Sequence, residues 1–358
     1  MKILYVTDCA LPSNGCWFYR NYLPAKWLRK KGHFVKWLAL GSEIPDEWMN
    51  FPDTVVFSRT YPRDPLPFMR KYKKLGKRVI YEVDDVLWKV NSDNPSAGIA
   101  TDWVHQYKTM MQEADAITTT TPYLAEELKK FSGNKNVFVC PNAIDYEMFH
   151  TRPNDKKELI IGYSGAASHW RDLNIITDAL KEIKKKHEFT FVLQGMCGCP
   201  LEAELYGYQR ILLQQLEPER KEYLETALKW FKEAKELQPV HVPFYPPELF
   251  PSVLRGTDID IGLIPLSETE FDKSKSCLKF YEYASVGTVS VASDVAPYNK
   301  EVTYRAKNNT KDWVKKIEKL IVDVPFREKL LAEQQAWVKE NRNFKHIVQQ
   351  WERALDPK

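Results

Sequence analysis

The sequence predicts an α/β protein built from two parallel-sheet domains that face each other across a cleft. Three observations carry this prediction. The chain has 358 residues, and a domain usually contains roughly 100 to 200. Short apolar runs alternate with amphipathic stretches, which is the pattern of βα units and a parallel sheet. The alternation stops in the polar segment 150–157 and restarts at Leu159, so we expect the domain boundary there.

The first domain is expected over residues 1–152. Its apolar runs predict strands at 2–7, 34–39, 54–57, 78–83, 115–118 and 136–139. The amphipathic stretches between the runs predict helices at 18–31, 64–75, 101–113 and 122–131. Ligands bind at the carboxyl ends of such strands, so the loops that follow them are the first place to look for a site.

The second domain is expected over residues 158–340 and repeats the alternation. Its strands are predicted at 159–163, 189–193, 258–264 and 288–292, and two of its helices at 170–186 and 275–285. Residues 202–238 are charged and helical in period, and we interpret them as a helical insertion. Three terminal helices are expected within 310–355, with breaks at Pro325 and near Asn341. The last one, within 341–358, could return to the first domain.

Charge and hydropathy exclude several classes of protein. The 52 Lys and Arg against 48 Asp and Glu give a net charge of +4, too small for wrapping duplex DNA as a main task. No apolar run suits a transmembrane helix, and the strand at 2–7 is too short for a signal-peptide core. We expect a cytoplasmic protein, in the host cytoplasm if a phage encodes it. Peripheral membrane contact through Trp17, Phe18, Trp27 and Trp37 is the alternative, although such aromatic residues more often belong to a core.

The six cysteines are scattered, and a chain of this length does not need disulfides to fold, so we interpret them as free thiols. Cys197 and Cys199 have one residue between them and no second Cys or His pair downstream. We therefore expect no metal site.

The first βα turn, residues 7–20, lacks the G-x-G-x-x-G pattern of dinucleotide enzymes. Gly15 would let the backbone approach a ligand, and free N–H groups at the helix start suit an anion. Arg20, one turn into the helix, would add a positive charge. The alternative is a turn glycine beside a solvated arginine.

Acidic residues end the strand predicted at 78–83. Glu82, Asp84 and Asp85 lie where the sheet edge is expected to bind ligands. Neighbouring carboxylates raise each other's pKa and can orient hydroxyls, accept a proton or hold a cation. If the strand continued, Asp84 and Asp85 would point to opposite faces and could not share one metal. Capping of a helix by one Asp is the alternative.

A loop of small residues follows the strand predicted at 159–163. Ser164, Gly165 and Ser168 leave room for phosphate oxygens against backbone N–H groups, and Arg171 could supply a counter-charge. His169 in the same loop is more often a surface or capping residue than a catalytic one.

The segment 261–287 carries the strongest signal. In the predicted helix, Lys275, Lys279 and Glu282 share one face, with Ser276 beside them. Lysines at a helix start oppose the helix dipole unless an anion lies there, and a diphosphate would be such an anion. Glu282, one turn deeper, could accept hydrogen bonds from a ribose diol. A solvated, salt-bridged helix is the alternative.

Several motifs together resemble those of the GT-B glycosyltransferases, and in particular the glycosyltransferase family 4-like group. They are Pro265-Leu266, Lys275-Ser276-x-x-Lys279-x-x-Glu282-Tyr283-Ala284 with Gly287, Val291-Ala292-Ser293, Pro297-Tyr298, Ala114 to Thr118, Pro141 to Asp145, and Asp84-Asp85. The resemblance covers nearly the whole chain except residues 202–238.

This resemblance implies two Rossmann-like domains, a nucleotide-sugar donor held mainly by the second, an acceptor held mainly by the first, and transfer with retention of anomeric configuration. It implies no cofactor and no required metal, because basic side chains and helix ends stabilise the departing diphosphate. The implied donor-binding residues are Gly15, Ser164, Gly165, Arg171, Pro265, Leu266, Lys275, Ser276, Lys279 and Glu282. The implied acceptor-side residues are Asn14, Trp17, Arg20 and Glu82, and the implied catalytic residues are Asp84, Asp85 and Lys275.

The chain departs from the family pattern at two positions. Ser274 stands eight residues before Glu282, where the family often has a second glutamate, and Ala166 follows Gly165, where it often has arginine. The second departure shifts the expected phosphate contacts toward Arg171, Lys275 and Lys279.

The leading hypothesis is a glycosyltransferase that uses a nucleoside-diphosphate sugar, with a glycan, a lipid-linked sugar or a modified DNA base as acceptor. The DNA alternative, transfer to a hydroxymethylated base, is motivated by the basic run 70–78. A non-catalytic nucleotide- or glycan-binding module is the alternative from another class, motivated by Ser274. An oxidoreductase fits less well, because neither domain carries the dinucleotide fingerprint.

Overall fold

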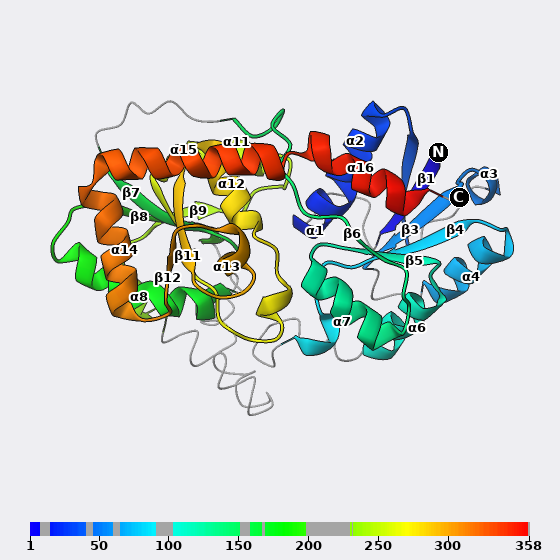
Figure 1. Cartoon of the computed structure of the whole chain (residues 1–358), viewed down its shortest axis with the longest axis horizontal. Helices are drawn as coiled ribbons and strands as arrows, with labels where there is room; N and C mark the ends of the chain where they lie inside the picture. Colours follow the sequence, from blue (N-terminus) through cyan, green and yellow to red (C-terminus); the bar gives the residue numbers. More distant parts are fainter. Residues whose placement is uncertain are drawn as a thin grey trace.

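The computed structural model describes residues 1–7, 15–40, 46–59, 65–90, 103–150, 158–166, 169–197, 230 and 232–356. These residues form two lobes, each built on a six-stranded sheet in which every pairing is parallel (Figure 1). The expected α/β class with two parallel-sheet domains is confirmed.

The first sheet has the strand order β2-β1-β3-β4-β5-β6. Its strands are β1 (Lys2–Thr7), β2 (Phe34–Ala39), β3 (Thr54–Ser58), β4 (Arg78–Glu82), β5 (Ala116–Thr119) and β6 (Val137–Val139). Its helices are α1 (Gly15–Trp17), α2 (Leu23–Lys30), α3 (Asp46–Asn50), α4 (Leu66–Lys74), α6 (Val104–Glu113) and α7 (Pro122–Ser132). A π-helical stretch, Phe18–Tyr22, joins α1 to α2, so the helix expected at 18–31 begins three residues earlier.

The second sheet has the order β12-β11-β10-β7-β8-β9. Its strands are β7 (Ile160–Ser164), β8 (Thr190–Cys197), β9 (Val240–Pro243), β10 (Ile261–Ile264), β11 (Val289–Ser293) and β12 (Arg305–Ala306). Its helices are α8 (Trp170–Lys184), α11 (Phe250–Gly256), α12 (Leu278–Val286), α13 (Tyr298–Glu301), α14 (Thr310–Val322) and α15 (Val324–Asn341). The sequence patterns missed β9, β12 and α11, and most of the insertion expected at 202–238 lies outside the described residues.

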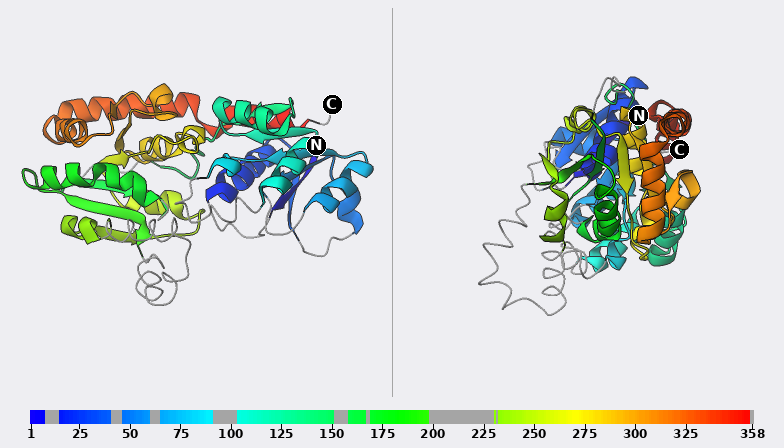
Figure 2. Two further views of the ribbon diagram at one scale, coloured as in Figure 1. Left: turned by 90° about the horizontal axis from the view of Figure 1, so that it is seen from below. Right: turned by 90° about the vertical axis from the view of Figure 1, so that its left-hand side faces the viewer.

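The terminal helices end where the sequence indicated. Asp323 caps α15 by accepting a hydrogen bond from Phe326 N, and Pro325 stands in its first turn, where the missing N–H does no harm. The chain then crosses to the first lobe as α16 (Phe344–Leu355). There α16 packs on α2, and Thr54 Oγ1 donates a hydrogen bond to Leu355 O (2.8 Å). Figures 1 and 2 show this red helix lying on the blue and cyan lobe.

The helix expected at 275–285 begins later, at Leu278. A 3-10 turn, Asp272–Ser274, precedes it, because the Asp272 carboxylate binds the backbone and hydroxyl of Thr269 while Ser274 Oγ donates to Phe271 O. Lys275 then has extended backbone angles (φ −61°, ψ 157°). The prediction that Lys275 shares one helix face with Lys279 and Glu282 is therefore wrong.

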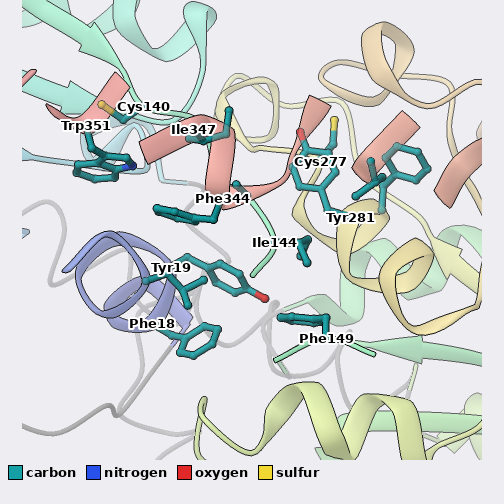
Figure 3. Packing of buried hydrophobic residues seen from close by; sticks show 14 of the residues in the cluster. Phe18, Tyr19, Cys140, Ile144, Phe149, Cys277, Tyr281, Phe344, Ile347 and Trp351 are labelled. Carbon is teal, nitrogen blue, oxygen red and sulfur yellow. The ribbon is translucent and has the colours of Figure 1, made fainter. Parts of the chain in front are cut away.

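The two lobes share a hydrophobic core. Phe18 and Tyr19 from the first lobe, Tyr281 from α12, and Phe344 and Trp351 from α16 belong to one buried cluster (Figure 3). The backbone also crosses between the lobes at two adjacent places. Ile144 N donates to Arg342 O (2.7 Å), and Phe344 N donates to Ile144 O (2.8 Å).

Candidate active site

A cavity of about 310 Å³ lies between the lobes, at the carboxyl ends of both sheets. Eleven of the site residues expected from the sequence line it: Gly15, Arg20, Asp84, Asp85, Ser164, Gly165, Leu266, Lys275, Ser276, Lys279 and Glu282. The cavity thus brings together residues that are up to 267 positions apart, from Gly15 to Glu282. This is where the rule for parallel sheets expects a ligand.

Glu282 projects from α12 and is only 7% exposed. Its Oε1 accepts a hydrogen bond from the hydroxyl of Tyr19 in the other lobe (2.7 Å). Burial raises the pKa of Glu282 to about 7, although the Tyr19 hydrogen bond and the charge of Lys279 act in the opposite direction. Glu282 is therefore a carboxyl group at the cavity wall that titrates near neutral pH and already holds one hydroxyl.

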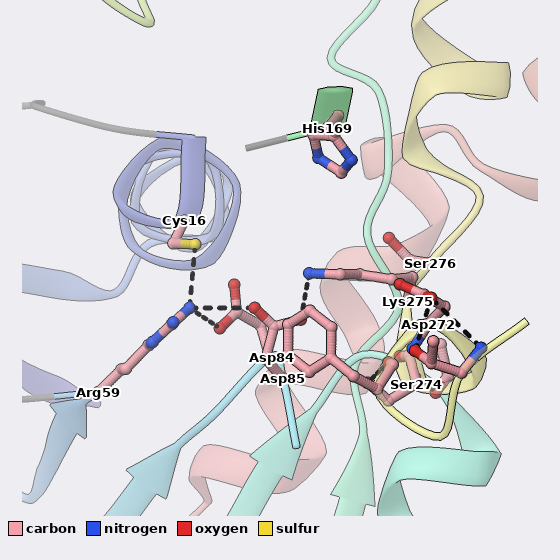
Figure 4. Close-up of polar contacts among 12 residues, drawn as sticks. Cys16, Arg59, Asp84, Asp85, His169, Asp272, Ser274, Lys275 and Ser276 are labelled. Carbon is pink, nitrogen blue, oxygen red and sulfur yellow. Dashed lines mark hydrogen bonds and ion pairs between the residues drawn. The ribbon is translucent and has the colours of Figure 1, made fainter. Parts of the chain in front are cut away.

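Lys275 reaches across the cavity to the first lobe. Its Nζ lies 2.8 Å from Asp85 Oδ1, and Arg59 Nη1 lies 3.0 Å from Asp84 Oδ1 and 3.2 Å from Asp85 Oδ2 (Figure 4). Burial raises the pKa of Asp85, but the charges of Lys275 and Arg59 outweigh it and hold that pKa below its usual value. Asp84 and Asp85 follow the end of β4 in a turn, so both reach the same guanidinium group, and Cys16 lies beside it.

Asn142 forms a further contact between the two lobes. Its Nδ2 donates to Ser276 Oγ (2.9 Å), while its Oδ1 accepts from Arg20 Nη1 (3.0 Å). The sequence analysis placed Asn142 in a family motif without giving it a role.

Arg20 and Glu82, which the sequence places at the acceptor side, contact each other in the folded chain. They form a buried pair in which Nε donates to Oε1 (2.7 Å) and Nη2 to Oε2 (3.1 Å). Arg20 also donates to Cys140 O, and Thr118 donates to Glu82. Arg20 therefore touches the cavity wall but its charge is neutralised internally, and Glu82 does not line the cavity.

Three further expected residues lie away from the cavity. Trp17 is buried and stacks on Tyr22 with ring centroids 5.6 Å apart. Arg171 is exposed on α8, and Pro265 is buried behind the wall. Trp17, expected at the acceptor side, instead buries its apolar surface in the core. Asn14 lies outside the described residues.

The chain just after β7 packs closely against the irregular part of β8. A side chain at Gly165 would lie 2.6 Å from the Tyr163 hydroxyl, and one at Gly195, where φ is +81°, would lie 2.8 Å from Gly165 O. Ser164 N donates to the Tyr283 hydroxyl (2.7 Å), which fixes the loop to α12. Gly165 N donates to Gln194 O (3.0 Å), so the N–H groups of Ser164 and Gly165 both have partners, and the small residues hold this loop against β8 and α12 at the cavity wall.

Lys279 and His169 complete the second lobe's side of the cavity. Within the described part of the chain Lys279 has no ion pair, and its Nζ lies 5.6 Å from the centroid of the Tyr163 ring. Burial lowers the pKa of Lys279, against the charges of Glu282 and Asp172. His169 Nδ1 lies 2.7 Å from Asp172 Oδ2.

The sequence analysis missed the aromatic rim after β9. Phe244 and Tyr245 line the cavity and are 59% and 38% exposed. The two valines at 240 and 242 before them are a weak strand signal that could have indicated this loop. Large exposed aromatic rings at a cavity mouth suit the stacking of a planar or sugar ligand.

The basic run 70–78 lies on the other edge of the first sheet, since it spans the end of α4 and the amino end of β4, whereas Asp84 and Asp85 follow the carboxyl end. Two of its six basic residues form ion pairs, Arg70 with Glu113 and Lys73 with Asp115.

No three His, Cys, Asp or Glu side chains of the described residues converge as metal ligands. No described helix is long and apolar enough to cross a membrane.

No family model and no curated protein matches the sequence. Solved structures do match over almost the whole chain. Sucrose-phosphate synthase from Thermosynechococcus elongatus is 13% identical, covers 99% of this chain and 98% of its own, and has a TM-score of 0.65. HepE from Anabaena, in complex with UDP and glucose, is 13% identical, with 99% of both chains covered and a TM-score of 0.67.

An alpha-glucosyltransferase in complex with UDP and a 13-mer DNA is 13% identical, with 99% of both chains covered and a TM-score of 0.66. These proteins share the arrangement of two facing parallel-sheet domains that the motifs led us to expect. The chain described here has the GT-B fold.

Proposed function

We propose that the protein is a glycosyltransferase that moves a sugar from a nucleoside-diphosphate sugar to an acceptor hydroxyl. One observation carries the proposal: Lys275, Lys279 and Glu282 converge on a single cavity between the lobes, beside the loop of Ser164 and Gly165. Cations suit a diphosphate, and a buried carboxylate suits a ribose diol. The GT-B fold shared with HepE, whose structure contains UDP and glucose, supports this assignment.

The chemistry follows from the charges. When the bond between sugar and diphosphate breaks, negative charge develops on the departing phosphate, and Lys275 and Lys279 are placed to stabilise it. Asp84 and Asp85 stay at the first lobe's wall, where a carboxylate can accept a hydrogen bond from the acceptor hydroxyl. By analogy with the fold, we also propose that domain 1–152 binds the acceptor and domain 158–340 binds the donor. The same analogy suggests that the transfer retains the anomeric configuration of the sugar.

Donor binding requires a rearrangement of these groups. Lys275 is paired with the Asp85 carboxylate of the first lobe, in the place that a donor phosphate would take. Glu282 is paired with the Tyr19 hydroxyl of the first lobe, in the place that a ribose hydroxyl would take. The donor therefore competes with contacts between the lobes, and its binding is coupled to their separation.

The test combines binding and turnover. Calorimetry with UDP-, GDP-, ADP-, CDP- and dTDP-linked sugars should find one donor that binds, and mass spectrometry of an acceptor library should find a product heavier by one sugar. Glu282→Ala should weaken donor binding, whereas the control Lys273→Met, at an exposed residue paired with Glu270, should not. Absence of binding by every donor would refute the proposal.

A non-catalytic binding module would bind a donor without turnover. Ser274 is fully buried and its Oγ donates to Phe271 O, so it holds the turn before Lys275 and does not line the cavity. Release of free sugar or transfer to any acceptor would exclude the module, because either reaction requires the chemical step.

A modified DNA base is the second candidate acceptor. The observation that favours it is the likeness, over 99% of both chains, to the alpha-glucosyltransferase whose structure contains DNA. Transfer to a duplex that contains hydroxymethylated bases, measured beside an unmodified duplex and a glycan library, decides between the acceptors. Binding that does not weaken with salt would count against DNA.

We further infer that the protein works in the cytoplasm. Cys16, Cys140 and Cys277, the cysteines whose side chains are described, form no disulfide, which suits a reducing compartment. Fractionation of cells that express the tagged protein tests this inference and detects peripheral membrane attachment.

A further inference from the structure

His169 lies at the start of α8 and lines the cavity on the same side as Lys279. Its ring orientation is fixed through Asp172, whose Oδ2 lies 2.7 Å from His169 Nδ1. Asp172 is itself 5% exposed, and its Oδ1 accepts hydrogen bonds from Ser267 N and Ser267 Oγ, both at 2.8 Å. A buried carboxylate with three hydrogen bonds stays ionised, so Nδ1 carries the proton and donates it to Asp172.

The other ring nitrogen, Nε2, has no hydrogen-bond partner among the residues that the structure describes. With Nδ1 occupied by Asp172, Nε2 is the nitrogen available to a ligand at the cavity wall. The side chain is 24% exposed, so solvent protons can reach it. His169 therefore combines an anchored ring with a free, accessible lone pair.

Four titratable groups face His169 from the elements around it. They are Asp172 on α8, Lys275 just before α12, Lys279 in α12, and Tyr163 on β7. The centroid of the Tyr163 ring lies 6.5 Å from that of the His169 ring. Burial and the two lysine charges lower the pKa of His169, against the effect of Asp172. The imidazole is neutral at pH 7 as a result. A diphosphate in the cavity would reverse this balance, because its negative charge offsets both lysines.

We propose that His169 is a donor-contacting residue that takes up a proton from solvent on Nε2 when a diphosphate enters the cavity, and then donates that N–H to a phosphate oxygen. Asp172 remains a carboxylate, and the imidazolium between Asp172 and the phosphate is stabilised from both sides. The proposal rests on the proposed donor site and adds a third cation to its two lysines.

Proton uptake makes donor affinity depend on pH in a defined direction. A ligand that raises the pKa of a group binds most tightly when the pH is below the pKa of that group in the free protein. The gain in affinity is lost as the pH rises through the pKa of the same group in the complex. Between those two values affinity falls by up to about tenfold per pH unit, since each pH unit corresponds to about 1.4 kcal/mol. Donor binding should therefore weaken from pH 6 to pH 8.5.

Calorimetry measures the proton directly. The full-length protein is titrated with UDP, with four other nucleoside diphosphates and with inorganic pyrophosphate, in buffers that differ in ionisation enthalpy. His169→Asn is the informative variant, because the Asn amide can still donate to Asp172 but cannot be protonated. His187→Asn is the matched control: His187 is 22% exposed, its Nε2 lies 3.1 Å from Glu318 Oε1, and it follows the far end of α8.

We expect the wild type and His187→Asn to take up the same number of protons, and His169→Asn to take up about half to one proton fewer near pH 7. The variant should bind about tenfold more weakly at pH 6, with the difference vanishing by pH 8.5. Glu282 also titrates near neutral pH, but it is present in all three proteins, so the difference isolates His169.

The outcomes are distinguishable. Equal proton uptake by the wild type and His169→Asn overturns the role of His169 and leaves the glycosyltransferase proposal intact. Failure of the wild type to bind any of the six probes overturns the donor site itself and this inference with it. A loss of affinity in His169→Asn that is the same at every pH overturns the proton uptake, because a purely structural role would not depend on pH.

Discussion

Replacing Tyr19 by Phe tests whether the first lobe competes with the donor for Glu282. The change removes one hydroxyl from a side chain that is 5% exposed and leaves its ring in the shared core. The lost contact is the 2.7 Å hydrogen bond to Glu282 Oε1. Hydrogen bonds to charged groups contribute about 1.5 to 3 kcal/mol, so the ligand-free protein should lose stability of that order above pH 7.

The same loss should favour the donor. In the wild type a ribose hydroxyl must replace the Tyr19 hydroxyl, whereas in Tyr19→Phe the Glu282 carboxylate is already without that donor. The free energy of 1.5 to 3 kcal/mol corresponds to about 10- to 150-fold in affinity, and we expect the lower end because water can hydrate the freed carboxylate. Melting temperature and the calorimetric Kd for the nucleoside diphosphate that binds best measure the two effects.

Tyr72→Phe is the matched control for this experiment. Tyr72 is fully buried in the first lobe, and its hydroxyl donates to Trp48 O (3.3 Å), away from the cavity. The control should lose some stability and keep the wild-type Kd. If Tyr19→Phe binds the donor more weakly than the wild type, Tyr19 holds the ribose together with Glu282, and the competition argument is wrong.

Three further changes follow from the same geometry. Lys279→Met should weaken donor binding about 10- to 100-fold, because a charge-assisted contact is lost, while Lys273→Met should not. An unchanged Kd for Lys279→Met would mean that Lys279 does not contact the donor. The transferase activity of the wild type should persist in EDTA. Glu282→Gln should raise the melting temperature more at pH 8 than at pH 5. The pKa of Glu282 is about 7 in the folded protein and the usual value is 4.5, so between these values the folded state binds more protons than the unfolded state. The stability of the wild type therefore falls as the pH rises through that window, and the variant avoids this loss. A gain of equal size at both pH values would contradict that pKa. Arg20→Met should cost about 3 to 5 kcal/mol of unfolding free energy in a denaturant titration, because it leaves Glu82 buried without its partner; a loss below 1 kcal/mol would mean that Glu82 is neutral.

Much of the fold could be predicted because it depends on local periodicity. Every strand with an apolar run of four or more residues appeared close to its expected position, whereas β9 and β12 are edge strands with mixed burial, which leaves little pattern to detect. The late start of α12 could not be predicted from helical spacing. It depends on hydrogen bonds of Asp272 and Ser274 to a turn, which compete with the helix.

The sequence predicted those parts of the site whose position depends on the edge of a sheet. Asp84 and Asp85 follow from their position after the carboxyl end of a strand, and Glu282 from its place in the helix that follows β10, but which charges neutralise each other does not. Arg20 and Glu82 are 62 residues apart and pair across the sheet, so the sequence offered no sign that both would be buried. His169 was set aside as a lone histidine, because its anchoring to Ser267 through Asp172 exists only in the folded chain.

The two adjacent crossings of the backbone limit how the cavity can open. The hydrogen bonds of Ile144 with Arg342 and Phe344 tie the outgoing chain to the returning one, and α16 fastens the return to the first lobe. Rotation about an axis through this pair keeps both bonds, while sliding or twisting of one lobe past the other would break them. Entry of a large ligand is thus confined to the side away from the crossings, and each cycle of opening returns the two halves to the same alignment.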